Sequence, residues 1–455
     1  MKLSDDSRMW HKRILTLAVP IILSNISVPL LGAVDTAVMG HLPDPAYIGA
    51  VAVGGIIFSF LYWGFGFLRM GTTGFAAQAF GAKDSNELRA TLARPILLAT
   101  ILGVAIVVLQ VGIRPLAFTF MSASDQVEAL AVVYFDIRIW GAPATLITYA
   151  LLGWLLGIGN ARAILLLQVV LNGLNIILNL LFVLGFGMTV DGVALATLIS
   201  EYAALALGLV IAARALSAWP GNWNLKNLLN RKRQGALLRV NADIFLRTFC
   251  LQIAFFSFTS QSGKLGELQL AANAILLQMH TFMGYAVDGF AHAVEVLAGN
   301  AIGARSRAAF RSAIKTSTIW AAGFALFFTL LFAFTGKSII ALYTDIEPLR
   351  ETAALYLPWV VALPLLSVWS YQLDGIFIGA TRTGAMRNAM VLSLGIFILA
   401  SWLLVPNYNN HGLWLALSLF MAGRAVTLGA FYPALVRSIS ERDQSTSEPA
   451  SAGSG

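Results

Sequence analysis

The sequence predicts an all-α polytopic membrane protein with twelve transmembrane helices, and three observations lead to that fold class. Hydrophobic residues make up 58% of the 455 residues and charged residues only 11%, whereas a typical soluble domain has about 25% charged residues. Apolar runs of about twenty residues, the length that spans a bilayer, recur along nearly the whole chain. Basic residues gather in every second connection between these runs.

The apolar runs define the elements in order. Their approximate limits are 14–39, 47–80, 91–113, 127–153, 161–185, 191–213, 238–262, 269–301, 312–335, 351–379, 387–405 and 411–436. The lone cysteine, Cys250, falls inside the seventh run, so the chain can form neither an internal disulfide nor a cysteine metal cluster.

The distribution of basic residues predicts the topology. If the N-terminus is cytoplasmic, the connections on the outer side contain only Arg114, Lys264, Lys337 and Arg350 as basic residues. The positive-inside rule then places both termini in the cytoplasm. The net charge of +8 thus reflects membrane topology, and we expect a bilayer rather than a nucleic acid as the partner. The expected location is the bacterial inner membrane, and the expected state is a monomer.

One polar segment, residues 217–237, divides the chain almost in half. We expect a six-helix N-lobe over 1–216, a cytoplasmic linker over 217–237 and a six-helix C-lobe over 238–436. The remaining residues, 437–455, are rich in serine, glycine and acidic residues and are expected to be a disordered cytoplasmic tail.

The two halves resemble each other at one constant offset in residue number. In this register "AFGAK" at 79–83 aligns with "AIGAR" at 301–305, and Arg89 aligns with Arg311. An even number of helices in each half makes the repeats parallel, with a central site between the lobes.

Ionisable and amide side chains inside the spans are the candidate functional groups. A carboxylate in hydrocarbon costs roughly 3 kcal/mol or more, so it usually marks a pathway, a relay or a paired site. Asp35 lies 22 residues after Arg13, or about 33 Å along a helix, which places it in the outer half of the membrane. Asn172, Asn175 and Asn179 share one face of the fifth helix. Interhelical hydrogen bonding is the simpler interpretation of this trio.

In the eighth helix Asp288, His292 and Glu295 lie on one face and form a second polar set, in the C-lobe. A structural network and a functional role are both open for it. Asp243 and Arg247 are spaced for a local ion pair. Other ionisable residues inside the spans are Asp374, Glu201, and Asp136 with Arg138. Arg69 and Arg424 also lie inside spans, and the sequence assigns no partner to either of them.

Enzymatic motifs are absent from the sequence. "TGKS" at 335–338 resembles the end of a phosphate loop, but Leu331 occupies the place of its first glycine. No zinc-protease motif, nucleotide motif or convincing serine triad occurs. The chain is therefore not expected to be an enzyme, and we expect no cofactor and no metal.

Several segments together resemble the multidrug and toxic compound extrusion (MATE) family, and within it the DinF branch. They are "LAVPIILSNISVPLLGAVDTAVMGHL", "QAFGAK", "LLGWLLGIGNAR", "DGVALATLISEY", "DGFAHAVE" and "LDGIFIGATR". The likeness covers about residues 10–436. It implies two six-helix lobes arranged as a V, and cation-driven antiport of small amphipathic, often cationic, compounds.

The resemblance also implies roles for particular residues. Asp35 matches the principal coupling residue of the family, and Pro20 matches a proline at which the first helix bends. Asn175, Asn179 and Thr197 match the polar site around that aspartate, to which we add Asn172. Asn179 replaces an aspartate that is common in the branch. The site thus has fewer negative charges, which favours protons over sodium as the coupling ion.

Other functions remain open. The broader branch includes citrate exporters, so the chain is alternatively an exporter of organic anions, which the buried acids disfavour unless Arg69 or Arg424 faces the chamber. Distant relatives with a similar architecture flip lipid-linked oligosaccharides, and they are expected to line their cavity with several basic residues. A receptor or scaffold fits poorly, because the sequence has no sizeable extramembrane domain.

Overall fold

The computed structural model describes residues 2–39, 44–119 and 124–439, and the side chains of 2–6, 28–37, 39 and 225 lie outside the described part. Regular structure within these ranges is helical. The N-lobe contains α1 Lys2–Met39, α2 Pro45–Trp63, α3 Phe67–Gly81, α4 Ser85–Val108, α5 Gln110–Thr119, α6 Asp125–Arg138, η1 Ile139–Gly141, α7 Ala142–Gly157, α8 Ala161–Asn179, η2 Leu180–Gly185 and α9 Val190–Ser217. The linker and C-lobe contain α10 Leu225–Leu228, α11 Arg231–Leu265, α12 Glu267–Gly303, α13 Arg307–Tyr343, α14 Glu347–Gly379, α15 Thr383–Gly429 and α16 Tyr432–Arg437.

These helices account for the twelve expected spans. Within the described residues, nine helical stretches are long and apolar enough to cross a membrane, and four of them join consecutive elements, namely α2 with α3, α6 with η1 and α7, α8 with η2, and α15 with α16. α15 runs for 47 residues but contains one non-helical residue, Asn409, which divides it into two spans. Counting α1, α12 and both halves of α15 gives twelve in the described part of the chain. The predicted tail falls largely on residues 440–455, outside the described residues.

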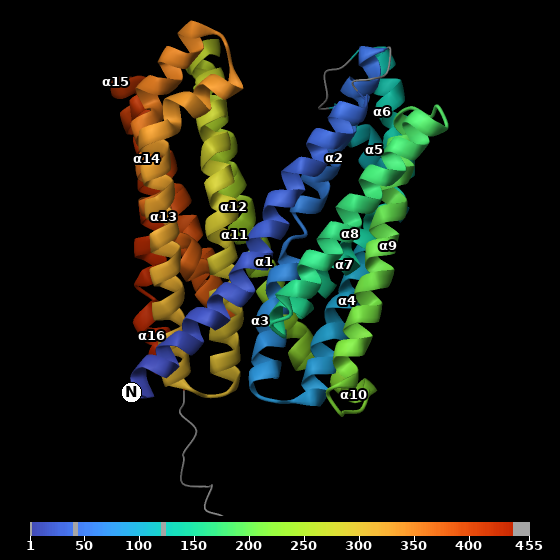
Figure 1. Cartoon of the computed structure of the whole chain (residues 1–455), viewed down its shortest axis with the longest axis vertical. Helices are drawn as coiled ribbons and strands as arrows, with labels where there is room; N and C mark the ends of the chain where they lie inside the picture. The colour runs from blue at the N-terminus through green and yellow to red at the C-terminus, as the bar shows by residue number, and fades with distance from the viewer. Residues whose placement is uncertain (1, 40–43, 120–123, 440–455) are drawn as a thin grey trace, which may run out of the picture.

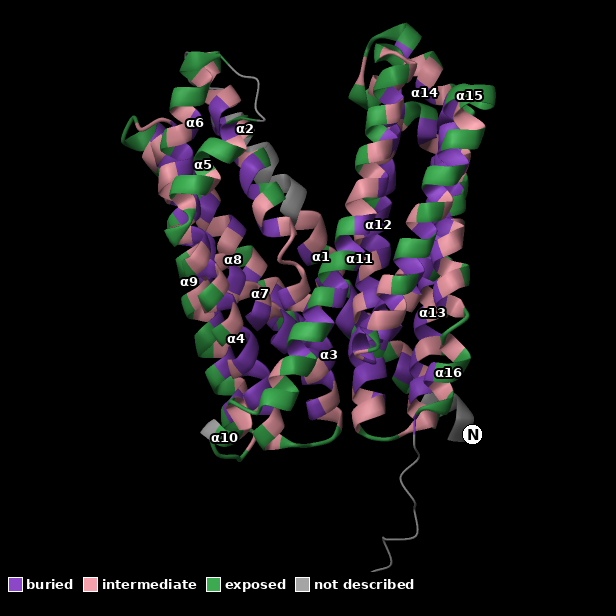
Figure 2. Ribbon diagram, turned by 180° about the vertical axis from the view of Figure 1, so that it is seen from behind, coloured by how far each residue is buried: buried purple, intermediate pink, exposed green. Residues whose placement is uncertain are grey.

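The lobes diverge from a shared lower half and form a V (Figure 1). Buried residues are dense in that lower half, where α3, α11 and α12 lie together (Figure 2). One apolar cluster there joins the lobes, since it includes Ile14 of α1, Trp154 of α7 and Phe290 of α12, all fully buried. The lobes thus meet through packed side chains at one end of the membrane and separate at the other.

The predicted duplication is confirmed by the helix boundaries. At the offset that aligns Ala79 with Ala301, helices begin at equivalent residues in four pairs, namely Pro45 and Glu267, Ser85 and Arg307, Asp125 and Glu347, and Ala161 and Thr383. Asp84 and Ser306, which are also equivalent, each cap the following helix through a side-chain oxygen that accepts a backbone N–H.

The repeat relation also shapes the contact between α3 and α12. A Cβ atom on Gly81 would clash with the carbonyl oxygen of Asn300, and one on Gly303 would clash with that of Gln78. Because residues 78 and 300, and 81 and 303, are equivalent in the duplication, the contact is reciprocal. The two helices therefore pack closely around the axis that relates the lobes.

α1 crosses between the lobes and binds to both (Figure 1). Asn25 Nδ2 donates to the backbone oxygen of Tyr285 in α12 of the C-lobe at 3.2 Å. Two residues later, Ser27 Oγ accepts from Asn172 Nδ2 in α8 of the N-lobe at 3.1 Å. α1 therefore contacts both α8 and α12, the helices that contain the predicted polar faces of the two lobes.

Candidate functional site

The asparagines predicted to share a face of α8 form a hydrogen-bonded chain with α9. Asn179 Nδ2 donates to Asn175 Oδ1 at 2.8 Å, and Asn175 Nδ2 donates to Thr197 Oγ1 at 3.0 Å. All three side chains are buried. We call this set the N-lobe polar chain; its amides and hydroxyl carry no net charge and do not titrate near neutral pH.

Asn172 belongs to the same face of α8, two turns before Asn179, but it faces α1. It donates to Ser27 and accepts from Gln168 Nε2 at 3.0 Å. Asp35 lies further along α1, and its side chain is outside the described residues. Pro20 also lies within α1, which is helical on both sides of it.

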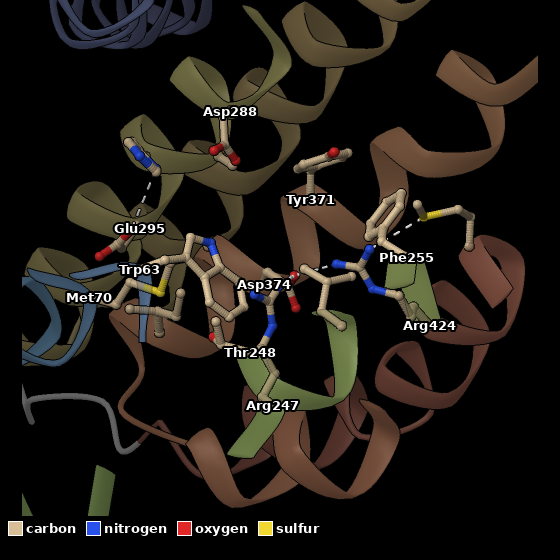
Figure 3. A pocket seen from close by; sticks show the side chains of 16 residues that line it. Trp63, Met70, Arg247, Thr248, Phe255, Asp288, Glu295, Tyr371, Asp374 and Arg424 are labelled. Carbon is tan, nitrogen blue, oxygen red and sulfur yellow. Dashed lines mark hydrogen bonds and ion pairs between the residues drawn. The ribbon is translucent and has the colours of Figure 1, made fainter. Parts of the chain in front are cut away.

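The C-lobe residues gather around a cavity of about 210 Å³. Figure 3 shows its side chains. Its ionisable residues come from four helices and are Arg247 of α11, Asp288, His292 and Glu295 of α12, Asp374 of α14, and Arg424 of α15. Trp63 and Met70 reach it from the N-lobe, so the cavity lies where the lobes meet. The four acidic and histidine residues predicted for the C-lobe thus line one cavity.

A buried ion triad forms one side of this cavity. Arg247 Nη2 and Arg424 Nη2 both donate to Oδ2 of Asp374, the latter at 2.8 Å. All three residues are buried. Arginine is effectively always protonated, so two fixed positive charges share one carboxylate.

The acids of α12 form the other side. His292 Nδ1 lies 3.7 Å from Glu295 Oε2, which is an ion-pair distance only if the histidine is protonated. Asp288 lies one turn before His292 and also faces the cavity. In Figure 3, Asp288 and Glu295 lie on the opposite side of Asp374 from Arg424. Arg69 of α3 is near enough to interact electrostatically with both acids.

The predicted ion pair between Asp243 and Arg247 is wrong. Asp243 pairs with Arg387 Nη1 of α15 at 2.7 Å and accepts from Thr383 Oγ1 at 3.1 Å. Arg247 extends the other way, to Asp374. Spacing within one helix places two side chains on one face, but here partners on neighbouring helices take both charges.

Asp136 and Arg138, which the sequence places together inside the fourth span, lie in different environments. Asp136 pairs with Arg114 at 3.0 Å, and both side chains are 45% exposed. Arg138 lies 3.5 Å from Glu201 and donates to Tyr134 at 2.9 Å, inside the N-lobe. Residues two apart on a helix face different directions, which explains the separation.

The role of the arginines was the main feature that sequence reasoning missed. Arg424 stood without a partner, and Arg247 was given the wrong one. One signal was available, because a buried cation needs a counter-ion and the C-lobe contains Asp374 in a neighbouring span. Among the described residues, no group of three or more His, Cys, Asp or Glu is placed to hold a metal ion.

Comparison with known proteins decides the family. The sequence model of the MatE family matches residues 20–181 and 244–403, one match in each half of the chain. Over 444 residues the chain is 44% identical to the DNA damage-inducible protein F of Escherichia coli (strain K12), covering 94% of this chain and 92% of that protein. The chain belongs to the MatE family.

More distant members of the MatE family share the fold. A solved structure of a multidrug resistance MATE family transporter of the MOP superfamily, in its outward-facing conformation, superposes with a TM-score of 0.83 at 20% identity, covering 94% of this chain and 96% of that one. The human multidrug and toxin extrusion protein 1 is 25% identical over 92% of this chain and 74% of its own length.

Membership in the MatE family makes this chain an integral membrane transporter, not an enzyme. The expected V of two repeated lobes is the fold of its structural neighbours. The substrates that MATE transporters handle are small molecules. Among the described residues, the N-lobe polar chain and the C-lobe cavity each bring together several of the predicted polar residues.

Proposed function

We propose that the chain is an antiporter that exports small amphipathic compounds bearing a cationic group in exchange for protons, which bind at Asp35. It acts as a monomer in the bacterial inner membrane, with both termini in the cytoplasm. The distribution of basic residues supports this orientation, because the connections facing the other side contain few of them.

The register between α1 and α8 supports a proton site at Asp35. Ser27 contacts Asn172, and both helices run in the same direction across the membrane (Figure 1). Position 35 lies eight residues beyond Ser27, about 12 Å along the axis, and Asn179 lies seven beyond Asn172, about 10.5 Å. Position 35 is therefore level with the N-lobe polar chain. The contact between Ser27 and Asn172, from which this register is counted, is the observation on which the proposal rests.

The neutral groups of that chain favour protons over sodium. Asn175, Asn179 and Thr197 supply hydrogen bonds but no negative charge. Hard cations such as sodium are bound best by several oxygen ligands, among which carboxylates supply the charge. A single carboxylate among amides is better suited to binding a proton, which neutralises it.

α1 connects proton binding with the C-lobe cavity. Asn25 is bonded to α12 at Tyr285, and Gly289 of α12 packs directly against Ala18 and Ile22 of α1. Gly289 adjoins Asp288, which faces the cavity. A proton that changes the preferred position of α1 thereby favours one arrangement of the cavity over another, which is what coupling requires.

The test uses proteoliposomes that contain the purified full-length chain and a fluorescent amphipathic cation. An imposed pH gradient should drive its uptake or release, whereas a sodium gradient should not. Asp35→Asn should abolish the pH-driven flux, because the amide keeps the shape of the side chain but cannot titrate. Asp136→Asn is the matched control, since it neutralises an exposed carboxylate of the same lobe and should leave the flux unchanged.

Flux that requires a sodium gradient and ignores the pH gradient would overturn the choice of ion. Normal pH-driven flux in Asp35→Asn would remove Asp35 from the mechanism.

Export of organic anions is the second candidate, and one observation favours it. Arg424 faces the C-lobe cavity together with Arg247. Three carboxylates line the same cavity, however, so a substrate with only negative charges meets repulsion as well as attraction. Efflux of citrate from loaded proteoliposomes, with no efflux of organic cations, would select this alternative.

A further inference from the structure

The ion triad of the C-lobe cavity has more positive charge than its own pairing requires. Arg247 and Arg424 both bind Oδ2 of Asp374, and neither guanidinium group can lose its proton. One arginine would be enough to neutralise Asp374. The second therefore adds a fixed, buried positive charge beside the cavity, and burying such a charge in a membrane is costly unless it has a use or a partner.

Both arginines also keep hydrogen-bond donors unused. Within the described residues, Nε–H of Arg247 and Nε–H of Arg424 are buried and have no hydrogen-bond partner. A guanidinium group typically binds a carboxylate through two parallel N–H groups, which gives strength and orientation. The triad is thus built like a carboxylate site whose donors are only partly occupied.

The opposite side of the cavity, on α12, carries acidic side chains instead of arginines. Asp288 and Glu295 face it from α12. His292 lies beside Glu295, Arg69 of the N-lobe interacts electrostatically with both acids, and Arg247 and Arg424 also interact with Asp288 across the cavity. If both acids are ionised, α12 presents two negative charges to the cavity, and the two arginines of the triad lie on other helices. The cavity is therefore polarised, with an acidic side on α12 and a basic side on α11 and α15 (Figure 3).

We propose that the cavity binds zwitterionic amphipathic compounds, with the carboxylate of the substrate on Arg247 and Arg424 and its cationic group on the acids of α12. The aromatic side chains of Trp63, Phe255 and Tyr371, which also line the cavity, contact the apolar part. This inference rests on the proposed export of cationic amphipaths and narrows the class to those that also carry an acidic group.

Two fluorescent probes that differ only in a carboxylate test the inference. Nα-dansyl-lysine is a zwitterion, and dansylcadaverine is the same molecule without the carboxylate. Binding of each is measured by equilibrium dialysis against the purified full-length chain in detergent near pH 7, without any gradient. The wild-type chain should bind dansyl-lysine about tenfold more tightly, because its carboxylate adds charge-assisted hydrogen bonds from the arginines of the triad.

Substitutions in the triad give results of opposite sign. Arg424→Gln and Arg247→Gln should each lower the preference for dansyl-lysine to about twofold or less while changing dansylcadaverine affinity little, since only the acidic group is affected. Asp374→Asn should raise the preference, because it frees both arginines from their internal partner. A purely structural triad would not show this rise. Arg114→Gln is the matched control, since Arg114 lies in an exposed ion pair of the N-lobe and does not line the cavity.

Equal affinities of the wild-type chain for the two probes would overturn the inference, as would a loss of both affinities together in folded Arg424→Gln. The experiment contains no ion gradient, so a failure of proton coupling at Asp35 would leave its result unchanged. The two proposals can therefore fail separately.

Discussion

The N-lobe polar chain between α8 and α9 consists of amides and a hydroxyl, whereas the C-lobe cavity is lined by carboxylates and guanidinium groups of α11, α12, α14 and α15. The helix boundaries of the two lobes nevertheless coincide at one constant offset. Asp374 corresponds to Leu152 and Arg424 to Tyr202 in this register. One duplicated scaffold thus carries two different polar chemistries.

The difference has an energetic meaning. Hydrogen bonds between neutral groups in a membrane contribute only about 0.6 kcal/mol on average, so the N-lobe polar chain can rearrange at low cost. Removing one partner of a buried ion pair typically lowers the stability of a protein by about 3–5 kcal/mol. The ion triad of the C-lobe should therefore hold its three helices firmly together. We therefore expect proton coupling in the N-lobe and substrate binding in the C-lobe.

The largest effect should come from exchanging an acid for its amide in each lobe. Asp35→Asn should abolish proton flux but leave substrate counterflow, which needs no protons. Glu295→Gln should weaken substrate binding about tenfold, as expected for a hydrogen bond or ion pair to a charged group, and retain pH-driven exchange. Proton flux and counterflow are measured for each variant in proteoliposomes.

The reverse outcome would move the coupling site. If Glu295→Gln loses proton flux and Asp35→Asn keeps it, the acids of α12 are the titrating groups and the lobes exchange the roles assigned to them.

A second carboxylate in the N-lobe should change the ion preference. In Asn179→Asp two negative charges would lie at the same level of the membrane, and at about 4 Å their repulsion is about 4 kcal/mol for an effective dielectric constant of about 20. A bound sodium ion relieves this repulsion. We expect sodium to inhibit proton flux in this variant and not in the wild type. Asn172→Asp, two turns away, is the matched control and should respond less.

Much of the fold could be predicted from sequence because it depends on local patterns. Runs of apolar residues give the spans, and the constant offset between the halves gives the repeat. The shared face of Asn175 and Asn179 also follows from helical spacing, and the structure places both in one hydrogen-bonded chain.

The ion pairs could not be predicted, because each depends on which helices are neighbours. Asp243 has Arg247 one turn away in its own helix, yet it pairs with Arg387, far along the chain. Arg424, the lone arginine of the last predicted span, pairs with Asp374. This pairing follows from the packing of α15 against α14, which the sequence does not give. Spacing along one helix contains no information about neighbours on another.

The smallest effect concerns the hydrogen bond that sets the register between α1 and α8. Ser27→Ala removes the hydroxyl that accepts from Asn172 at 3.1 Å, while the backbone oxygen of Ser27 still accepts at 3.2 Å. The loss of stability should therefore be about 0.6 kcal/mol or less. Proton flux should fall at most about threefold, because about 0.6 kcal/mol changes the equilibrium constant for the aligned state by that factor.

Ser317→Ala in the C-lobe is the matched variant for this last comparison, because Ser317 Oγ also bridges two helices, from the backbone oxygen of Phe290 to Gln372. Thermal unfolding in detergent and proton flux in proteoliposomes are measured for both variants. Each should show a similar small loss of stability, but only Ser27→Ala should lose flux, since only α1 carries Asp35. Equal loss of flux in the two variants would show that the bond supports the fold in general and does not position the proton site.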